Sequence, residues 1–479
     1  MTSAPPVPRL LWFLGLAGAL LFVSALGNPG TGILTYKHIE AAVAVAVLVH
    51  LMWTVDPAWL FSGAIAASMF SSNWRLLGFG STFVPDRVLL GAGLVAFVCR
   101  FPPARDRPKI ELKPVHGVLA AAVLYVAISG WLSGGFAQRE GFFKLLDSFG
   151  IVPFVMFAIA PAAFRTRQQR KILLGVLLAT GAYLGVTTLF EALKLNALVF
   201  PHYITNPRLG IHEGRGRGPF LAADANGMAL YGCGVAAVIA FLQAKQPRPR
   251  AFALAVALLD FGGTFLTLTR SVWIGTVVAS LVLLVVASRL RRYLIPAAAV
   301  GAAFVLGALA VIPGLASEAS QRQHDQRPIW DRENGNAAAL RMLEARPLLG
   351  FGWNEFVPRS IDYYRQPQNY PQTSVGRPLH NALLSNFVEL GIVGGGLWVV
   401  GLLMACGRAI TRRGPPDLGP WKVGLAAIVL QWAVVSSFAP AAYAFPNLLM
   451  WTWAGVASVG LASESGRVRA VARRAHAHA

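Results

Sequence analysis

The chain has 479 residues with a formal net charge of +21, and 55% of its residues are hydrophobic while only 13% are charged. The apolar residues come in repeated blocks of about 15 to 20 rather than in amphipathic stripes. A large soluble core is excluded, because a soluble protein of this length would carry roughly twice the share of charged residues. We therefore predict an all-α, polytopic bundle of transmembrane helices.

Candidate membrane spans occur along most of the chain. Several are short for a hydrocarbon core of about 30 Å, so we expect about 12–14 true spans. The first stretch is interpreted as a retained helix, because more spans follow it and no cleavage pattern precedes a soluble domain. The stretches are Leu10–Leu26, Ile39–Trp53, Ala58–Phe70, Val84–Cys99, Val115–Ile128, Ile151–Phe164, Ile172–Phe190, Asn226–Leu242, Ala251–Leu266, Val272–Ala287, Leu294–Ile312, Ala382–Ala405, Trp421–Phe438 and Pro446–Leu461.

Lys and Arg concentrate in every second connection between these spans, which is the pattern of cytoplasmic loops. The high positive charge then needs no nucleic-acid partner. The remaining connections face the periplasm of a bacterial cell, and the protein is expected in the inner membrane. The basic connections contain Arg100, Arg105, Arg107 and Lys109; Arg165, Arg167, Arg170 and Lys171; Lys245, Arg248 and Arg250; Arg289, Arg291 and Arg292; Arg408, Arg412 and Arg413; and Arg467, Arg469, Arg473 and Arg474.

This topology divides the chain into four regions. Residues 1–312 hold transmembrane helices and an Arg-rich periplasmic loop near 206–226, and residues 313–380 form a large periplasmic loop. Residues 381–462 return to the membrane, and residues 463–479 form a basic cytoplasmic tail beside anionic membrane lipid. The large loop has a helix-like stretch near Asn336–Ala345 and then a run rich in Tyr, Gln, Asn and Pro. Its length favours a functional loop.

Three arginines stand on the predicted periplasmic side, where the charge rule expects few. Arg215 and Arg217 are flanked by glycines, which let the backbone approach a ligand, and their planar guanidinium groups suit phosphate oxygens. Arg270 stands between two apolar helices with almost no loop around it, so an anion is the expected partner. The alternative for all three is contact with lipid head groups.

A polar cluster marks the point where the large loop re-enters the membrane. Arg377, His380 and Asn381 precede an apolar helix that contains Glu389. His380 is a candidate general base near neutral pH. Glu389 is nine residues further on and falls on the opposite side of an ideal helix, so a direct pair with His380 is not expected. The alternatives are a helix-start role for His380 and a structural hydrogen bond for Glu389.

Four motifs in series resemble the O-antigen ligase and O-antigen polymerase superfamily of bacterial membrane glycosyltransferases. They span roughly Glu191–Val400 and agree in order and spacing. One departure is Ala225, where that family usually has a proline before the asparagine. The motifs are Gly216–Phe220 with Asp224–Asn226, Leu268–Ser271, Arg346–Gly352, and His380–Asn381 followed by Glu389–Gly391.

The resemblance implies an inverting glycosyl transfer that needs neither metal nor cofactor. The donor would be a glycan on undecaprenyl diphosphate, with its diphosphate bound by Arg215, Arg217 and Arg270. His380 would activate the acceptor hydroxyl, and Asn226, Arg377, Asn381 and Glu389 would support the site. Consistent with this, Cys99, Cys233 and Cys406 show no metal-binding spacing.

Several acceptors fit the same motifs. A ligase would pass the glycan to lipid A core in lipopolysaccharide assembly, and a polymerase would pass it to another lipid-linked repeat in exopolysaccharide biosynthesis. A protein O-oligosaccharyltransferase would pass it to a pilin Ser or Thr. From a different functional class, a transporter of a lipid-linked anionic glycan would use the same arginines to line a path.

Overall fold

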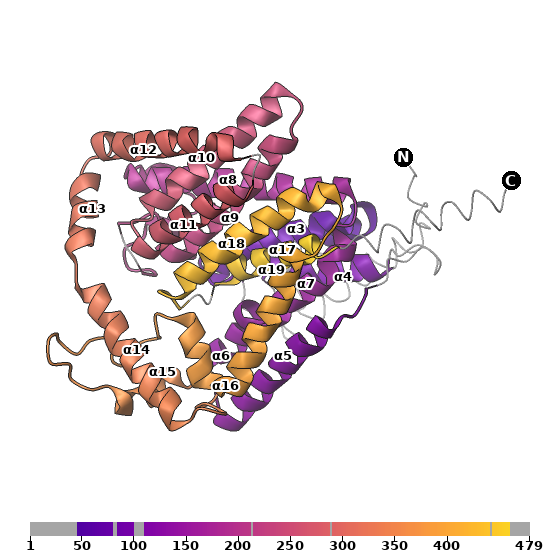
Figure 1. Ribbon diagram of the computed structural model, residues 1–479. Coiled ribbons are helices and arrows are strands. Elements are labelled where there is room, and N and C mark those ends of the chain that lie inside the picture. The colour runs from indigo at the N-terminus through magenta and orange to yellow at the C-terminus, as the bar shows by residue number, and fades with distance from the viewer. Residues whose placement is uncertain are drawn as a thin grey trace, which may run out of the picture.

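The computed structural model describes residues 46–79, 84–99, 110–211, 214–287, 290–440 and 443–459, apart from the side chains of residues 322 and 323. Throughout these ranges the regular elements are helices, as predicted (Figure 1). The predicted first helix, Leu10–Leu26, and the predicted tail, 463–479, lie outside the described residues.

The helix bounds follow the apolar blocks of the sequence to within a few residues. The principal helices are α3 (Pro57–Ala67), α4 (Pro85–Cys99), α5 (Pro114–Ser133), α6 (Arg139–Phe143), α7 (Ile151–Ala163), α8 (Arg167–Ala192), α9 (Ala223–Gln243), α10 (Pro247–Leu266), α11 (Arg270–Val286), α12 (Leu294–Val311), α13 (Leu315–His324), α14 (Arg327–Ala345), α15 (Phe356–Ser360), α16 (Ala382–Leu402), α17 (Arg408–Thr411), α18 (Gly419–Ser436) and α19 (Ala444–Ala457).

Eight helical stretches in the described part of the chain are long and apolar enough to cross a membrane, and Pro57–Phe70 and Arg270–Val286 are shorter apolar helices. The protein is therefore a multi-pass membrane protein. The full count of 12–14 spans stays a prediction. The eight stretches are Pro114–Ser133, Arg139–Ala163, Arg167–Ala192, Ala223–Gln243, Pro247–Leu266, Arg291–Val311, Ala382–Thr411 and Pro416–Ser436.

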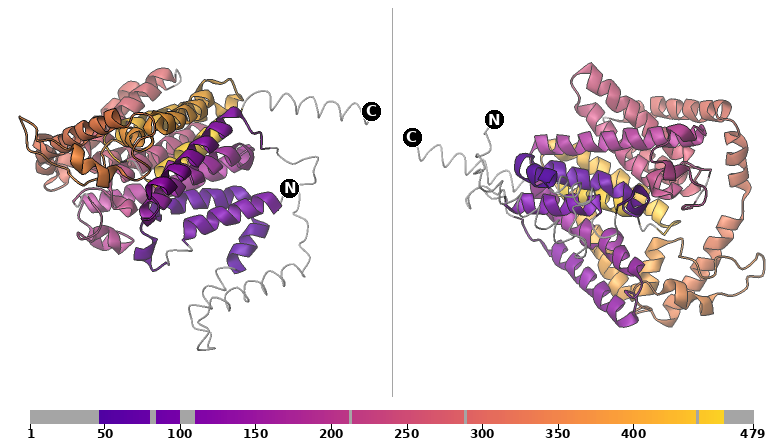
Figure 2. Two further views of the ribbon diagram at one scale, coloured as in Figure 1. Left: turned by 90° about the horizontal axis from the view of Figure 1, so that it is seen from below. Right: turned by 180° about the vertical axis from the view of Figure 1, so that it is seen from behind.

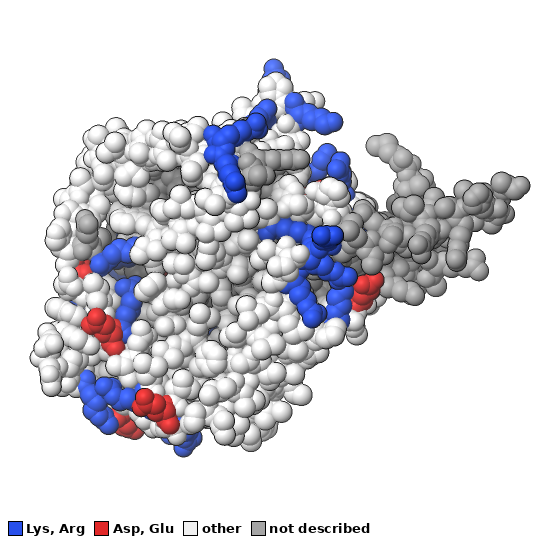
Figure 3. Space-filling model, viewed as in Figure 1, with Lys and Arg blue, Asp and Glu red and all other residues white. Residues whose placement is uncertain are grey.

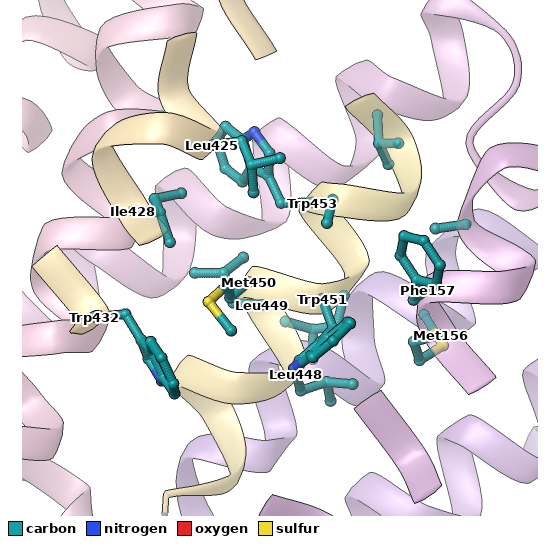
Figure 4. Packing of buried hydrophobic residues seen from close by; sticks show 14 of the residues in the cluster. Met156, Phe157, Leu425, Ile428, Trp432, Leu448, Leu449, Met450, Trp451 and Trp453 are labelled. Atoms are coloured by element: carbon teal, nitrogen blue, oxygen red, sulfur yellow. The ribbon is translucent and has the colours of Figure 1, made fainter. Parts of the chain in front are cut away.

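The shortest of the C-terminal apolar helices, α19, occupies the centre of the bundle. Every residue from Phe445 to Ala457 is buried, so the helix is enclosed on all sides. Trp451 packs edge-on against Phe154 of α7 with ring centroids 4.6 Å apart. The ring centroids of Trp453 and Trp421 in α18 are 4.7 Å apart. Figure 4 shows Trp451 and Trp453 among the other buried apolar side chains around α19. This dense aromatic packing fixes where the N-terminus of α19 emerges.

The predicted large loop is mostly helical rather than irregular. Helices α12, α13 and α14 follow one another around one side of the bundle, and α14 and α15 lie beside the start of α16 (Figures 1 and 2). The expected helix near Asn336–Ala345 is the second half of α14, which begins nine residues earlier at Arg327. The segment thus has a fixed shape that can hold side chains against the membrane helices.

Helix α16 is broken at Gly391, whose φ of 66° and ψ of −175° are not helical. The segment 346–352 fills the break. The amides of Phe351 and Gly352 donate to the carbonyls of Val388 and Glu389 at 3.0 and 2.8 Å. A side chain at Gly391 would collide with the carbonyl oxygen of Leu348 at 2.1 Å. Two of the sequence motifs, Arg346–Gly352 and Glu389–Gly391, therefore lie side by side. Each supplies hydrogen-bond partners for the backbone groups that the break in the helix leaves unpaired.

Candidate functional site

Four helices begin around one cluster of charged side chains. They are α9, α11, α16 and α19, and their N-terminal residues or the residues just before them supply Asp224, Arg270, His380 and Tyr443. The Tyr443 hydroxyl donates to the Asp224 carboxylate at 2.6 Å, which joins α19 to α9. Helix N-termini carry partial positive charge, so their convergence favours a bound anion.

His380 is half-buried within this cluster. Its pKa lies below the usual histidine value, first because of burial and then because of the nearby Arg332 guanidinium. The carboxylates of Asp331 and Asp224 oppose this shift, and Arg377 adds a smaller lowering. Neutral imidazole is therefore favoured at neutral pH, and neutral imidazole is the form that can accept a proton.

Two arginines from different helices, α11 and α14, belong to the same cluster. Arg270 is the first residue of α11, and its guanidinium donates to the carbonyl of Asp325 at 2.8 Å. Arg332, in α14, donates to the carbonyl of Phe438 at 3.2 Å. Burial lowers the pKa of Arg332, and the positive charge of Arg270 lowers it further. An anion between the two guanidinium groups would relieve their mutual repulsion.

Arg217 has a different environment. It is 3% exposed, and its guanidinium donates to the carbonyls of Ile204, Asn206 and Leu209, with its shortest contacts at 2.7 Å. Its backbone amide lies 3.4 Å from a carboxylate oxygen of Glu191. In this structure the Arg217 side chain holds its own loop together. Its contact with a diphosphate stays a prediction.

Asn226 supports the same loop. Its side-chain amide donates to the Gly216 carbonyl at 3.0 Å and to the Thr188 hydroxyl at 2.8 Å. Gly218 has a φ of 53°, and a Cβ there would lie 2.6 Å from the Asn226 side-chain oxygen. The glycine and the asparagine of this motif are therefore needed together. Arg215, one turn earlier, is half-buried.

The remaining predicted residues lie around His380. Arg377 is exposed, and its backbone amide donates to the Ser374 carbonyl at 3.2 Å. Asn381 caps α16, since its side-chain oxygen accepts from the Leu384 amide at 3.1 Å. Capping fixes where α16 starts and therefore also fixes the backbone position of His380, the residue before the cap.

Glu389 faces away from His380. Its carboxylate forms an ion pair with Lys144 at 2.9 Å and accepts from the amide of Asn354 at 3.1 Å. The Lys144 ammonium also lies 4.4 Å from the centre of the Trp353 ring. Glu389 thus ties the break in α16 to the segment after α5. As predicted, it is no direct partner of His380.

Sequence reasoning missed Asp331, Arg332 and Tyr443. Asp331 and Arg332 lie outside the recognised motifs in a charged stretch, and Tyr443 lies in a short turn between apolar helices. No local pattern shows that these segments meet. The signal that could have been used is a charged pair in the longest polar segment on the predicted periplasmic side. Within the described ranges, no group of three or more His, Cys, Asp or Glu is placed to hold a metal ion.

Charged side chains on the surface fall into two groups. Figure 3 shows one group over the α9–α10 turn and the right-hand edge, and another at the left and lower left, with a broad uncharged surface between them. The first group is almost entirely basic, whereas acidic and basic side chains mix in the second. Such an uncharged band suits the hydrocarbon core of a bilayer.

Residues 253–399 match the family model described as O-Antigen ligase. Over these residues the chain is similar to the O-antigen ligase family. The resemblance predicted from the sequence motifs is thereby confirmed over this stretch, which runs from α10 into α16 and includes Arg270, Arg332, His380 and Glu389. Arg217 and Asp224 precede the matched residues. No curated protein matches the chain at a significant level.

Proposed function

We propose that the protein is a glycosyltransferase of the O-antigen ligase type in the bacterial inner membrane. It would move a glycan from undecaprenyl diphosphate to an acceptor hydroxyl in surface polysaccharide assembly. The observation that carries the proposal is the half-buried His380 beside Arg332, in a cluster that also contains Arg270. The O-antigen ligase domain supports the reaction class.

The proposed reaction site lies on the face where α9, α11, α16 and α19 begin. This face is away from the basic connections, so the charge rule assigns it to the periplasm. Glycans on undecaprenyl diphosphate that are ready for assembly would be met there. The hydrocarbon tail would remain in the bilayer while the diphosphate reaches the arginines.

His380 would act on the acceptor. As the acceptor oxygen attacks the anomeric carbon from the side opposite the diphosphate, the anomeric carbon–oxygen bond breaks and the configuration inverts. The proton of the acceptor hydroxyl passes to the neutral imidazole of His380, whose lowered pKa keeps it unprotonated beforehand. The products are the extended acceptor and undecaprenyl diphosphate.

The leaving diphosphate gains negative charge as this bond breaks. Arg270 and Arg332 would stabilise it, together with the positive N-termini of α9 and α11. Arg377, exposed at the edge of the cluster, would contact the outer phosphate or the donor glycan. Arg215 and Arg217 keep the diphosphate role predicted from the sequence as a further proposal. Arg217 would have to release its carbonyl partners to fill that role.

A direct test uses purified protein in nanodiscs with a glycan on undecaprenyl diphosphate and separate candidate acceptors. His380→Ala is expected to lower the transfer rate by roughly 10²- to 10⁴-fold, which is the usual contribution of a general base. Donor binding should stay at the level of the parent protein. Transfer by His380→Ala at the parent rate would rule out the proposed role of His380.

The same preparation separates the enzyme from a transporter. An enzyme adds sugar to an acceptor in detergent, where there are no two sides. A transporter adds none and instead moves the lipid-linked donor across a vesicle membrane. Movement without transfer to any acceptor would overturn the proposed function.

The identity of the acceptor distinguishes the three possible reactions. Lipid A core, a second lipid-linked repeat and a Ser or Thr of a pilin each offer a hydroxyl that His380 could deprotonate. Offering the three acceptors in parallel distinguishes a ligase, a polymerase and a protein O-oligosaccharyltransferase by the product that forms.

A further inference from the structure

A cavity of about 430 Å³ lies outside the His380 cluster, and Ala444, the residue after Tyr443 of that cluster, is part of its wall. Its wall comes from the turn after α3, the start of α4, and the segment from α6 to Ser148. The volume is in the range of small-ligand sites, which is roughly 300–1,000 Å³. None of these segments lies within the matched O-antigen ligase domain.

Basic side chains outnumber acidic ones in this cavity. Arg75, Arg87, Arg139 and Lys144 line it, against Glu140 and Asp147. Two of the cations have partners, because Arg87 pairs with Asp147 at 2.6 Å and Lys144 pairs with Glu389. Across the described residues, no ion pair involves Arg75 or Arg139, and both side chains are exposed.

The Arg87 side chain is fixed in the wall of the cavity. Its guanidinium pairs with Asp147 and lies 4.5 Å from the centre of the Phe143 ring. The side chain is 24% exposed, so its positive charge is only partly screened by water. An anion bound by Arg75 and Arg139 would lie in the same cavity as this charge.

Aromatic side chains complete the wall. Trp74 and Phe143 both line the cavity, and the indole of Trp74 is held by a hydrogen bond to Asp86 at 2.7 Å. Flat aromatic faces pack against the carbon–hydrogen faces of sugar rings. A cavity with aromatic faces, cations and serine hydroxyls suits a sugar that carries a negative charge.

Three contacts connect the cavity to the reaction site. Ala444 lines it and directly follows Tyr443, which bonds to Asp224. Lys144 lines it and pairs with Glu389 in α16, the helix that His380 precedes. Asn73, between two lining residues, donates to the Pro219 carbonyl at 2.7 Å, just before α9. The guanidinium of Arg270 donates to the carbonyl of Asp325, just after α13. The proposed donor site therefore lies toward α11 and α13, whereas the cavity lies toward α3, α4 and α6.

We propose that this cavity binds the acceptor glycan through a phosphate or carboxylate group on one of its sugars. This inference rests on the proposed glycosyl transfer, because it assigns the cavity to the second substrate of that reaction. Arg75 and Arg139 bind the anionic group, Arg87 adds positive charge to the wall, and the aromatic rings contact the sugar. The acceptor hydroxyl then extends past Tyr443 toward His380.

The first test measures sugar binding to the full chain in zwitterionic nanodiscs by saturation-transfer NMR. The probes are glucose 6-phosphate and glucuronate, with glucose as the neutral comparison. Both anionic probes should bind more tightly than glucose. Arg75→Gln combined with Arg139→Gln should weaken their binding by roughly fivefold or more. Arg359→Gln is the matched control, because Arg359 is exposed and outside the cavity, and binding should stay at the parent level.

Two binding results would overturn the inference. One is equal affinity for glucose and glucose 6-phosphate, and the other is unchanged affinity in the double variant. Whether the cavity instead binds the anionic head group of a membrane lipid is tested by repeating the measurement in discs that contain phosphatidylglycerol. Displacement of glucose 6-phosphate by that lipid would assign the cavity to head groups and also overturn the inference.

A transfer assay separates failure of this inference from failure of the proposed function. With an anionic acceptor, the double variant should raise the acceptor KM and leave kcat and donor affinity unchanged. Normal transfer with an unchanged acceptor KM would overturn the cavity's role and leave the proposed function standing. Arginine-dependent sugar binding by a parent protein that transfers glycan to no acceptor would overturn the proposed function.

Discussion

Arg217 and Arg270 both come from motifs of the predicted periplasmic face, yet the structure uses them differently. Arg217 is buried and donates to three carbonyls of its own loop. Arg270 starts a helix, and its charge is felt by Arg332 across the cluster. The comparison separates a guanidinium whose donors are taken up by three backbone carbonyls from one that has a single carbonyl partner and faces a second cation. Burial and hydrogen-bond partners distinguish the two.

The largest expected effect tests the structural side of this comparison. Arg217→Ala leaves the carbonyls of Ile204, Asn206 and Leu209 without their donor, which should cost roughly 4 kcal/mol. Lysine cannot make the same fork, so Arg217→Lys should lose most of this stability as well. Thermal unfolding of the purified variants measures the effect. A normal melting temperature with weakened donor binding would instead place Arg217 in the diphosphate site.

Glu389 offers a second test of a structural motif residue. Glu389→Gln breaks its ion pair with Lys144, whose side chain is 22% exposed while that of Glu389 is 3% exposed. The expected loss is about 3 kcal/mol, because one charge is left without its partner. Adding Lys144→Met should recover part of that loss. If the double variant is no more stable than Glu389→Gln alone, the pair is not coupled.

For Arg270 and Arg332, which we propose bind the donor, we expect changes in donor affinity without large changes in stability. Arg270→Ala and Arg332→Ala should each weaken binding of the lipid diphosphate by about tenfold, or roughly 1.4 kcal/mol. Their melting temperatures should fall less than that of Arg217→Ala, because Arg270 donates to one backbone carbonyl and Arg332 to two, whereas Arg217 donates to three. Equal donor affinity in Arg270→Ala and the parent would contradict the diphosphate role.

The smallest effect is a change in pH dependence. His380 must be neutral to accept a proton, so kcat/KM should fall as the pH drops through its pKa. Arg332 lowers that pKa, and Arg332→Gln should therefore move the acid limb to higher pH. Arg377→Gln should shift it in the same direction but less, and Arg359→Gln should leave it unmoved. A shift to lower pH in Arg332→Gln would show that Arg332 does not act on His380.

The sequence was sufficient for the helices and for some residues of the candidate site. Apolar blocks mark the helices because lipid and core both require apolar side chains. His380 and Arg270 stood out as polar residues beside such blocks. Arg332 and Tyr443 could not be found in this way, because their importance comes from chain segments that meet only on folding. The break at Gly391 was equally hidden, since its geometry depends on the segment 346–352.

The interruption of α16 also bears on how the protein meets bilayers of different thickness. An unbroken span that tilts to match a thicker or thinner bilayer carries its whole length with it. In α16 the residues on both sides of Gly391 are hydrogen-bonded to the segment 346–352, so both parts of the helix are held at the break. His380 precedes the first of these parts. The histidine that we propose as the general base should therefore keep its position when the acyl-chain length changes, and transfer rates should vary little between nanodiscs of short and long lipids.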